Sequence, residues 1–295
     1  LLFIATLTVM SGITIVSTLP LISQNFSHIP NIDFYSKMLL TIPAIVVALF
    51  APFVGVLVDK VGRLKPLYVG IALFVIGGSS GFYLDNFWMI LAGRAVLGVA
   101  VALLMTTSIA LIGDYFEEEE RHQYMSLQGM AVGVGGILFI SAGGFLADYH
   151  YSYPFAIYLI PLLFVPFIVA NLYEPTRHKV ADTKTQQKSL WPIYATGFFV
   201  MVLFYMLPTQ FPYLIMDQLK GDPSDIGMVI AASMLINAIA AMQYAKLKAI
   251  FGFTKLFAII FLLFGIGLMV IAVAETILHL YASTIFMGIG FGLTM

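Results

Sequence analysis

The chain alternates between long apolar runs and short polar connections. Ten runs approach the length of about 20 mostly apolar residues that a membrane-crossing helix needs. Regular alternation of apolar and polar residues, which a barrel strand would show, is absent, and the runs are too long for such strands. We therefore predict ten membrane-spanning helices, over residues 1–22, 39–58, 67–84, 87–115, 124–147, 154–173, 190–215, 226–245, 256–274 and 277–295.

The composition is that of a chain whose solvent is largely lipid. Hydrophobic residues make up 61% of the 295 residues and charged residues 10%, against about 25% charged residues in soluble domains. A soluble fold of this length buries only about three quarters of its surface, so much of this apolar surface would face water. The lipid bilayer is therefore the first partner that the sequence predicts.

Charge and residue chemistry argue against several other classes of function. A formal net charge of −1 argues against nucleic acid as a partner, and the absence of cysteine excludes disulfides and thiolate metal sites. The five histidines are not paired at a metal-ligand spacing. We expect neither a metal nor another cofactor. An integral-membrane enzyme would need a cluster of His, Asp or Cys at one membrane face, which the sequence lacks.

The first apolar run does not read as a signal peptide, because it lacks a basic leader, is too long and is followed by further spans. The chain both begins and ends inside an apolar run. We therefore expect a chain that is truncated after about ten spans.

Basic residues are distributed unevenly among the connections, and this bias sets the expected orientation. Connections after odd-numbered runs hold only Lys37 and Lys220, and Arg94 lies within the fourth run. We predict that the even-numbered connections and the N-terminus lie in the cytoplasm, in a protein of the cell (inner) membrane. The other eleven of the 14 basic residues follow even-numbered runs and are Lys60, Arg63, Lys65, Arg121, Arg177, Lys179, Lys184, Lys188, Lys246, Lys248 and Lys255.

The longest connection predicted on the cytoplasmic side, 174–189, is polar and rich in Lys, Gln and Thr. Pro175 ends the sixth run, and the composition is typical of a flexible linker. We therefore divide the chain into a six-helix bundle (1–173), a linker (174–189) and a partial, four-helix second bundle (190–295).

Residues 55–65, between the second and third runs, fit the pattern Gly-x-Leu-x-Asp-(Lys/Arg)-x-Gly-Arg-x-(Lys/Arg). The charge bias of cytoplasmic loops explains the cations of this segment but neither its aspartate nor its glycines. The residue types, their spacing and their place in the topology resemble the signature loop of the major facilitator superfamily of secondary transporters. The matching residues are Gly55, Leu57, Asp59, Lys60, Gly62, Arg63 and Lys65.

The chemistry of this loop suggests a role for its main residues. Gly55 is expected to let its helix approach a neighbour closely, and Gly62 to form a tight turn with positive φ. Arg63 suits a carboxylate partner, and the topology places Asp114, at the end of the fourth run, on the same membrane face. The resemblance implies that Asp59 faces the start of an eleventh helix, which this chain does not contain. It also implies that the loop and Asp114 act as a conformational latch.

Arg94 is the one basic residue deep inside a predicted span. A charge at this depth normally faces a cavity or a partner, so Arg94 is a candidate for the substrate cavity. The alternative is a structural hydrogen-bond hub that holds helices one, four and five together. The Arg-x-x-x-Gly spacing of Arg94 and Gly98 also resembles the fourth helix of the superfamily. Gly98 gives this helix a small face for close packing.

The fifth run is rich in glycine and resembles the fifth helix of antiporters in the superfamily. Gly135 and the pair Gly143-Gly144 match that pattern, whereas its Gly-Pro step is replaced by Phe139-Ile140. We expect these glycines to form a hinge or a close packing seam.

Isolated polar residues in the apolar runs are further candidates for a substrate cavity. The seventh run carries two prolines that would interrupt a helix. They lie close to Tyr205 and Gln210, and transporters often build binding sites at interrupted helices. Gln128 in the fifth run and Asn237 in the eighth are the other candidates. For each of these residues, a hydrogen bond that serves helix packing is the alternative.

The connection 245–255 occupies the place at which a repeat of the 55–65 segment would fall. It keeps the cations and Gly252 but has no acid. This weak echo predicts a two-fold internal repeat.

Together these features predict an all-α membrane protein with a major-facilitator-like helical bundle. The resemblance implies alternating access, in which two bundles rock about a central cavity and a small-molecule solute crosses unchanged. We predict an efflux-type carrier of drugs or metabolites. The alternatives are a sugar or organic-anion carrier and a truncated family member that does not transport. No Asp or Glu lies in the middle of a run, which leaves both a coupling proton and uniport open.

Overall fold

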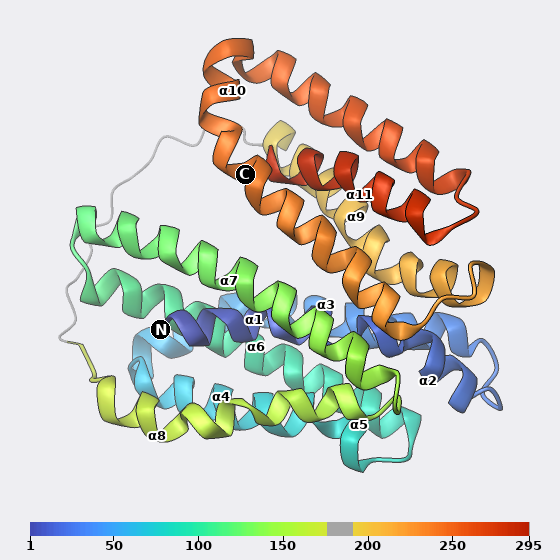
Figure 1. The fold of residues 1–295 in the computed structure, drawn as a ribbon. Helices are drawn as coiled ribbons and strands as arrows, with labels where there is room; N and C mark the ends of the chain where they lie inside the picture. Colours follow the sequence, from blue (N-terminus) through green and yellow to red (C-terminus); the bar gives the residue numbers. More distant parts are fainter. Residues whose placement is uncertain (176–190, 295) are drawn as a thin grey trace.

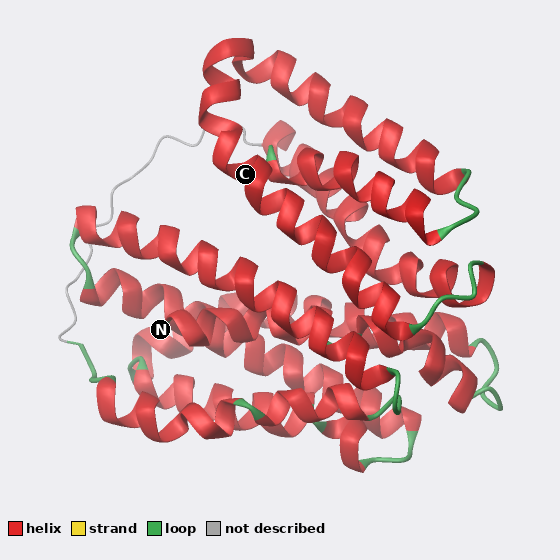
Figure 2. Ribbon diagram, in the orientation of Figure 1, coloured by secondary structure: helices red, strands yellow, loops and turns green. Residues whose placement is uncertain are grey.

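The computed structural model describes residues 1–175 and 191–294 of the chain. Within these ranges the regular secondary structure is helical, with no strand (Figure 2). The predicted all-α class is therefore confirmed. The predicted linker 174–189 lies almost entirely outside the described residues.

The first six predicted runs fold as α1–α8, which lie together as a first helix group (Figure 1). The first, third and sixth runs each consist of more than one helical segment. The segments are α1 (Leu2–Ile13), η1 (Val16–Thr18), α2 (Leu19–Asn25), α3 (Ile32–Val61), α4 (Leu64–Gly78), α5 (Ser80–Tyr83), α6 (Phe87–Tyr115), α7 (Glu118–Ala147), η2 (Tyr153–Leu159) and α8 (Pro161–Asn171).

The last four predicted runs fold as α9–α11, which form a second helix group (Figure 1). Its segments are α9 (Trp191–Tyr213), the π-helical turn η3 (Leu214–Gln218), α10 (Pro223–Ala272) and α11 (Ile277–Gly292). α10 has two antiparallel parts that meet at Gly252, so it accounts for both the eighth and the ninth run. That the two groups move as separate bundles stays a prediction.

Length and hydropathy mark eight of the described helices as long and apolar enough to cross a membrane. They cover every predicted run except the third and the tenth, which correspond to the shorter apolar helices Leu64–Gly78 and Ile277–Gly292. The third run gains length from α5, which follows α4 after a single residue. Eight of the ten predicted spans thus correspond to helices long enough to cross a membrane, and the other two correspond to shorter apolar helices.

Gly62 and Gly252 are the two glycines with positive φ in the described part of the chain, at +107° and +72°. Their ψ values, 179° and 168°, are also similar. Glycine adopts this backbone conformation without the steric cost that a Cβ brings. Gly62 turns α3 into α4, and Gly252 turns the first part of α10 into the second, so the predicted echo has the same local backbone. The predicted connection 245–255 does join two helices, but it is shorter than expected, because helix continues up to both sides of Gly252.

The core of the first group is centred on α6, which lies against α3 and α4. Gly98 allows α6 to lie very close to α3. A Cβ atom at this position would lie 2.8 Å from the Pro43 carbonyl oxygen and 2.7 Å from Val46 Cβ. Lipid tails are as apolar as the helices themselves, so close contacts between small residues carry much of the packing.

Glycines of α7 have the same function toward the first span. A Cβ on Gly135 would lie 3.0 Å from Thr6 Cβ, and a Cβ on Gly143 would collide with the Thr14 carbonyl oxygen. At Gly135 and Gly143 the packing seam expected for the fifth run therefore lies against α1 and the residue that follows it, whereas Gly144 lies against α10.

The two groups approach each other at one end and diverge toward the other. We call the end that carries the connection 59–65 the signature end, and the other the opposite end. Figure 1 shows the end of α7 close to the start of α10, at the opposite end, and the start of α7 far from α10. Close backbone contact marks the approach, since a Cβ on Gly144 would lie 3.3 Å from Gly227 Cα.

Replacing Gly98 by Ala is expected to destabilise the fold, because the added methyl group overlaps Pro43 and Val46 on α3. The free energy of unfolding should fall by about 1–3 kcal/mol, the usual cost of overpacking. Gly113→Ala on the same helix is the control, since no atom lies within 4 Å of its Cβ position. Thermal unfolding in detergent, followed by tryptophan fluorescence, measures both variants, and equal midpoints would contradict the close contact.

Candidate functional site

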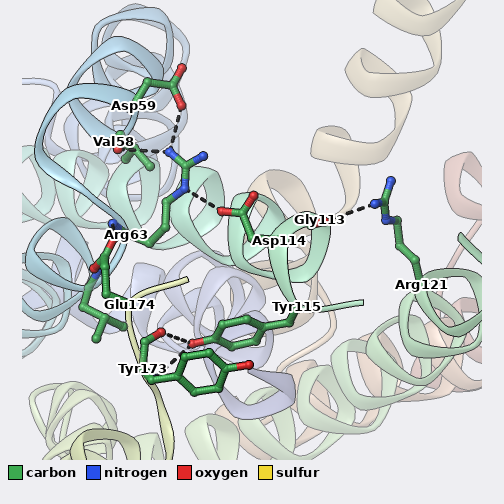
Figure 3. Close-up of polar contacts among 10 residues, drawn as sticks. Val58, Asp59, Arg63, Gly113, Asp114, Tyr115, Arg121, Tyr173 and Glu174 are labelled. Carbon is green, nitrogen blue, oxygen red and sulfur yellow. Dashed lines mark hydrogen bonds and ion pairs between the residues drawn. The ribbon is translucent and has the colours of Figure 1, made fainter. Parts of the chain in front are cut away.

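The connection between α3 and α4 is held by a carboxylate from the end of the sixth span. Gly62 ends α3, and its N–H donates to the Val58 carbonyl at 3.2 Å. The backbone N–H groups of Arg63 and Leu64 donate to Glu174 Oε1 and Oε2, at 2.5 and 2.9 Å (Figure 3). N–H groups at the start of a helix have no partner within the helix, and the positive end of the helix dipole favours a carboxylate. Glu174 therefore caps α4.

Gly62 is required here for a second reason besides its positive φ. A Cβ at this position would lie 2.6 Å from Glu174 Oε1, so any other residue would displace the carboxylate. Glu174 falls in the predicted linker, and its role is missed from the sequence. The topology that pairs Arg63 with Asp114 also places Glu174, directly after the sixth run, on the same membrane face, and that was the available signal.

The Arg63 side chain joins the ends of α3, α4 and α6. Its Nε donates to Asp114 Oδ2 at 2.8 Å. Its Nη1 donates to Asp59 Oδ1 at 2.8 Å and to the Val58 carbonyl at 3.0 Å (Figure 3). The pairing of Arg63 with Asp114 that the topology predicts is therefore present. Burial lowers the pKa of Arg63, but the hydrogen bonds and charges of Asp114 and Asp59 outweigh burial and raise the pKa above its ordinary value. The guanidinium stays charged.

The two carboxylates that contact Arg63 differ in exposure. The side chain of Asp114 is 17% exposed and that of Asp59 is 74% exposed, whereas that of Arg63 is 13% exposed. Water screens the exposed ion pair much more than the half-buried one. Asp114 is therefore the main anchor of the guanidinium. The predicted role of Asp59 in a latch stays a prediction.

The remaining residues of the 55–65 segment contribute less to this cluster. Lys60 and Lys65 are exposed. Gly55 does not make the expected close contact, because no atom lies within 4 Å of its Cβ position. Near Gly55, it is Val54 and Val58 of α3 that pack against α6. The expectation for Gly55 is wrong because hydropathy does not fix the rotation of a helix that is apolar on all sides.

A tyrosine pair ties the end of α6 to the end of the sixth span. The Tyr115 hydroxyl donates to the Tyr173 carbonyl and accepts from the Tyr173 N–H at 3.1 Å, and the two rings stack with centroids 4.7 Å apart (Figure 3). Arg121, at the start of α7, donates to the Gly113 carbonyl at 3.1 Å. These contacts hold the ends of three spans beside Arg63.

The chemistry of this cluster is charge pairing and helix capping. Its guanidinium and carboxylates hold helix ends in fixed relative positions, and both kinds of contact depend on where the helices lie. Among the described residues, no three His, Cys, Asp or Glu gather in a way that could hold a metal ion.

Arg94 lies in the middle of the first group, and its exposed fraction is 0%. Its Nε donates to the Leu39 carbonyl at 2.8 Å, its Nη2 to the Ser11 carbonyl at 2.5 Å, and its Nη1 to the Tyr158 hydroxyl at 3.0 Å. The Tyr158 hydroxyl in turn donates to the Ser11 carbonyl at 3.0 Å. The guanidinium thus joins α6 to α1, α3 and η2.

The sequence and the helix bounds explain why neither carbonyl acceptor has a helical N–H donor. In a regular helix the Leu39 carbonyl accepts the N–H of residue 43, but Pro43 has no N–H. Ser11 lies in the last turn of α1, which ends at Ile13, and carbonyls there lack helical partners. This conformation realises the hub alternative for Arg94. The expected hub joins the fourth span to the first and fifth spans. The hydrogen bonds instead join α6, the fourth span, to α1, α3 and η2, which belong to the first, second and sixth spans. The cavity role stays a prediction.

The four other cavity candidates are spread over three helices. Tyr205 and Gln210 are exposed on α9, and Gln210 Oε1 accepts from Lys37 Nζ at 3.2 Å. Gln128 on α7 and Asn237 on α10 are half-buried. Their contact with a solute is still only predicted.

The unequal burial of the two carboxylates predicts unequal effects of neutralising them. Asp114→Asn should lower the free energy of unfolding by about 1–3 kcal/mol, because it leaves a half-buried guanidinium with a weaker partner. Asp59→Asn is the matched variant at the same Arg63–carboxylate distance, and its effect should stay below about 0.5 kcal/mol because water screens the pair. Chemical denaturation in detergent measures both variants, and equal losses would contradict this ranking.

Removal of the Tyr158 hydroxyl tests the hub. Tyr158→Phe leaves one guanidinium N–H of the buried Arg94 without its acceptor, which should destabilise the protein by about 1–3 kcal/mol. Tyr153→Phe in the same segment η2 is the control, because Tyr153 is exposed, whereas Tyr158 is fully buried. If thermal unfolding shows the same midpoint for both variants, the Tyr158 hydroxyl does not stabilise the hub.

Comparison with known proteins agrees with this architecture. The family model described as Major Facilitator Superfamily matches residues 1–209. The chain is 27% identical over 219 residues to Multidrug resistance protein 2 of Bacillus subtilis (strain 168), a match that covers 67% of this chain and 54% of that protein. It is also 27% identical over 214 residues to the class H Tetracycline resistance protein of Pasteurella multocida, covering 70% of this chain and 52% of that protein. The chain thus spans about half the length of these relatives.

Solved structures share the fold. A bacterial homologue of the human lysosomal transporter Spinster, in an inward-facing and unoccupied conformation, superimposes with a TM-score of 0.79 at 17% identity, over 99% of this chain and 71% of that one. A D-xylose-proton symporter superimposes with a TM-score of 0.72 at 16% identity, over 99% of this chain and 79% of that one. At these identities the likeness concerns the fold alone. Since the family model also covers residues 1–209, the chain belongs to the major facilitator superfamily, a family of membrane transporters rather than enzymes.

Proposed function

We propose that the protein is a secondary transporter that moves a small-molecule solute across the bilayer by alternating access, as an efflux-type carrier of drugs or metabolites. Membership of the superfamily supports transport, and the two resistance proteins among its relatives support the class of solute. The organic-anion alternative rests on Arg94. Its guanidinium has no exposed surface and donates to two carbonyls and a hydroxyl, so this conformation offers an anion no contact there.

One observation carries the alternating-access part of this proposal: the two helix groups are joined by hydrogen bonds at the opposite end. At the signature end, α7 and α10 diverge (Figure 1), and the Arg63 cluster stays within the first group. Contact at one end with separation at the other is what an end-state of an alternating-access cycle requires, and this supports the proposal. The hydrogen bonds between described side chains or backbone that cross the groups join Tyr213 to Ser23 and Ser36, Lys37 to Gln210, and Ser224 to Asp148.

The proposal places the signature end and the N-terminus in the cytoplasm, as the charge bias predicts, in the cell membrane. The described state is then inward-facing. In the outward-facing state the two groups would meet at the signature end, where the exposed Asp59 carboxylate is suited to contact the positive end of a helix dipole. This is the latch that the proposal assigns to the loop.

The moving bodies of the proposal are residues 1–173 and 190–295, with 174–189 as their linker. Arg94 braces the interior of the first body and Arg63 braces its signature end, so this body is suited to move as one unit. In the second body, α11 packs against both parts of α10, which supports the same behaviour.

Flux measurements test the proposal. The protein in proteoliposomes should move tetracycline or a cationic dye, and Asp59→Asn should reduce the flux about fivefold, as expected for loss of a carboxylate worth about 1 kcal/mol at a helix end. The unfolding midpoint of this variant should stay unchanged, because Asp59 is exposed. Asp85→Asn, at an exposed acid of the opposite end, is the control and should transport normally.

Other outcomes of this assay would overturn parts of the proposal. Flux of a sugar or an organic anion, without flux of drugs, would transfer the protein to the alternative carrier class. A folded protein that moves none of these solutes would be a family member without transport. An imposed proton gradient that accelerates flux identifies the coupling ion, and equal flux with and without the gradient identifies a uniporter.

A further inference from the structure

Three hydroxyl groups meet where the first and second helix groups touch at the opposite end. The Tyr213 hydroxyl, at the end of α9, lies 2.7 Å from Ser36 Oγ and 3.0 Å from Ser23 Oγ, and the two serine oxygens are 2.7 Å apart. Both serines are buried. Ser36 Oγ also donates to the Ile32 carbonyl at 2.8 Å, so the three hydroxyl protons are shared among four contacts. The Tyr213 hydroxyl therefore ties α9 to α2 and α3.

Lys37 contacts the same tyrosine. Its Nζ lies 4.6 Å from the centroid of the Tyr213 ring, which is a cation–π distance. The same Nζ donates to Gln210 Oε1 at 3.2 Å. Since Tyr213 and Gln210 both belong to α9, α3 holds α9 through two neighbouring residues of its own, Ser36 and Lys37.

A second polar contact joins α7 to α10. Asp148, the residue that follows α7, accepts the backbone N–H of Ser224 through Oδ1 at 3.0 Å. Ser224 is the second residue of α10, where N–H groups lack helical partners and the helix dipole favours a carboxylate. The backbones are in contact beside this bond, because a Cβ on Gly144 would lie 2.9 Å from the Pro223 carbonyl oxygen.

We propose that the Ser23–Ser36–Tyr213 hydroxyl cluster and the Asp148–α10 contact form a polar latch that closes the opposite end in the described state and opens during transport. This inference rests on the proposed function. Unlike the bonds of Arg63 and Arg94, these bonds connect the two helix groups. Their partners are groups that water satisfies almost as well, so opening exchanges them for bonds to water at a small net cost. Such a latch is specific and also readily reversible.

A single introduced cysteine reports on this junction, because the chain has none of its own. Ser17→Cys is suited to the purpose. Ser17 is fully buried in η1, which lies against α9 and α10, and its hydroxyl makes no hydrogen bond with the protein. A membrane-impermeant maleimide applied to oriented vesicles from the opposite end should label this cysteine slowly in the otherwise unchanged protein.

Latch variants in the Ser17→Cys background should label faster from the opposite end. Tyr213→Phe and Asp148→Asn should each raise the labelling rate about fivefold, the shift in population expected when one hydrogen bond of ordinary net strength is lost. Ser36→Ala is a second variant of the hydroxyl cluster. Combined with Tyr213→Phe, it should add little, because both changes break the same contact.

Tyr149→Phe and Asp85→Asn are the matched controls. Both residues are exposed at the opposite end, and neither makes a hydrogen bond to the second group in the described part of the chain. Their labelling rates should equal that of Ser17→Cys alone. Thermal unfolding of each variant identifies one that fails to fold, and the other latch variants then carry the test.

Two results would overturn the latch. One is labelling of folded latch variants at the rate of the controls. The other is an equal rise in labelling from the signature end, which indicates general loosening. Labelling needs no transported solute, so it is independent of the flux assay. Absent flux with latch-dependent labelling counts against the proposed function alone, and normal flux with unchanged labelling counts against the latch alone.

Discussion

A polar group at membrane depth has no water to satisfy it, and the arrangement of the first helix group depends on how Arg94 meets this constraint. Pro43 leaves the Leu39 carbonyl without a helical partner, and Arg94 donates to that carbonyl at 2.8 Å. One turn beyond Arg94, Gly98 allows α3 to approach α6 at Pro43 itself. The same proline therefore provides both the close contact and the free acceptor. Packing and hydrogen bonding select the same placement of α3 on α6, which explains why a charged residue stabilises this apolar core.

The same constraint separates the hydroxyl groups of the molecule into two kinds. In the first span, Thr6, Thr8, Ser11, Thr14 and Thr18 all donate to carbonyls three or four residues earlier in the chain. These hydroxyls are satisfied locally and are indifferent to what the neighbouring helices do. At the opposite end the Tyr213 hydroxyl instead bonds to two serines of the first group, so it keeps these partners only while the two groups stay together. A hydrogen bond within one helix is unaffected when neighbouring helices separate, whereas a hydrogen bond between helices is broken.

The predictable features are those that depend on residue type and topology. Apolar runs of sufficient length predict the helices, and the pairing of Arg63 with Asp114 follows from two opposite charges at the same membrane face. The partners of Arg94 are harder to predict, because two of them are backbone carbonyls, which no residue type identifies. The close contact predicted for Gly55 is wrong for another reason: the sequence of a helix that is apolar on all sides does not indicate which side faces its neighbour. Glu174 is predictable only in part. Its charge and its place at this membrane face follow from the sequence, but its partners are backbone N–H groups, which no residue type identifies.

Comparison of the two positive-φ glycines shows whether the turn between two helices needs an acidic residue beside it. Gly62 and Gly252 each turn one helix into the next with a similar, positive-φ backbone conformation. At Gly62 a carboxylate occupies the space where a Cβ would lie, whereas no atom lies within 4 Å of the corresponding point at Gly252. The turn therefore forms without any acid beside it. Glu174, Asp114 and Asp59 are then not needed to reverse the chain. Their clustering around Arg63 instead holds the helix ends of the first group together at the signature end.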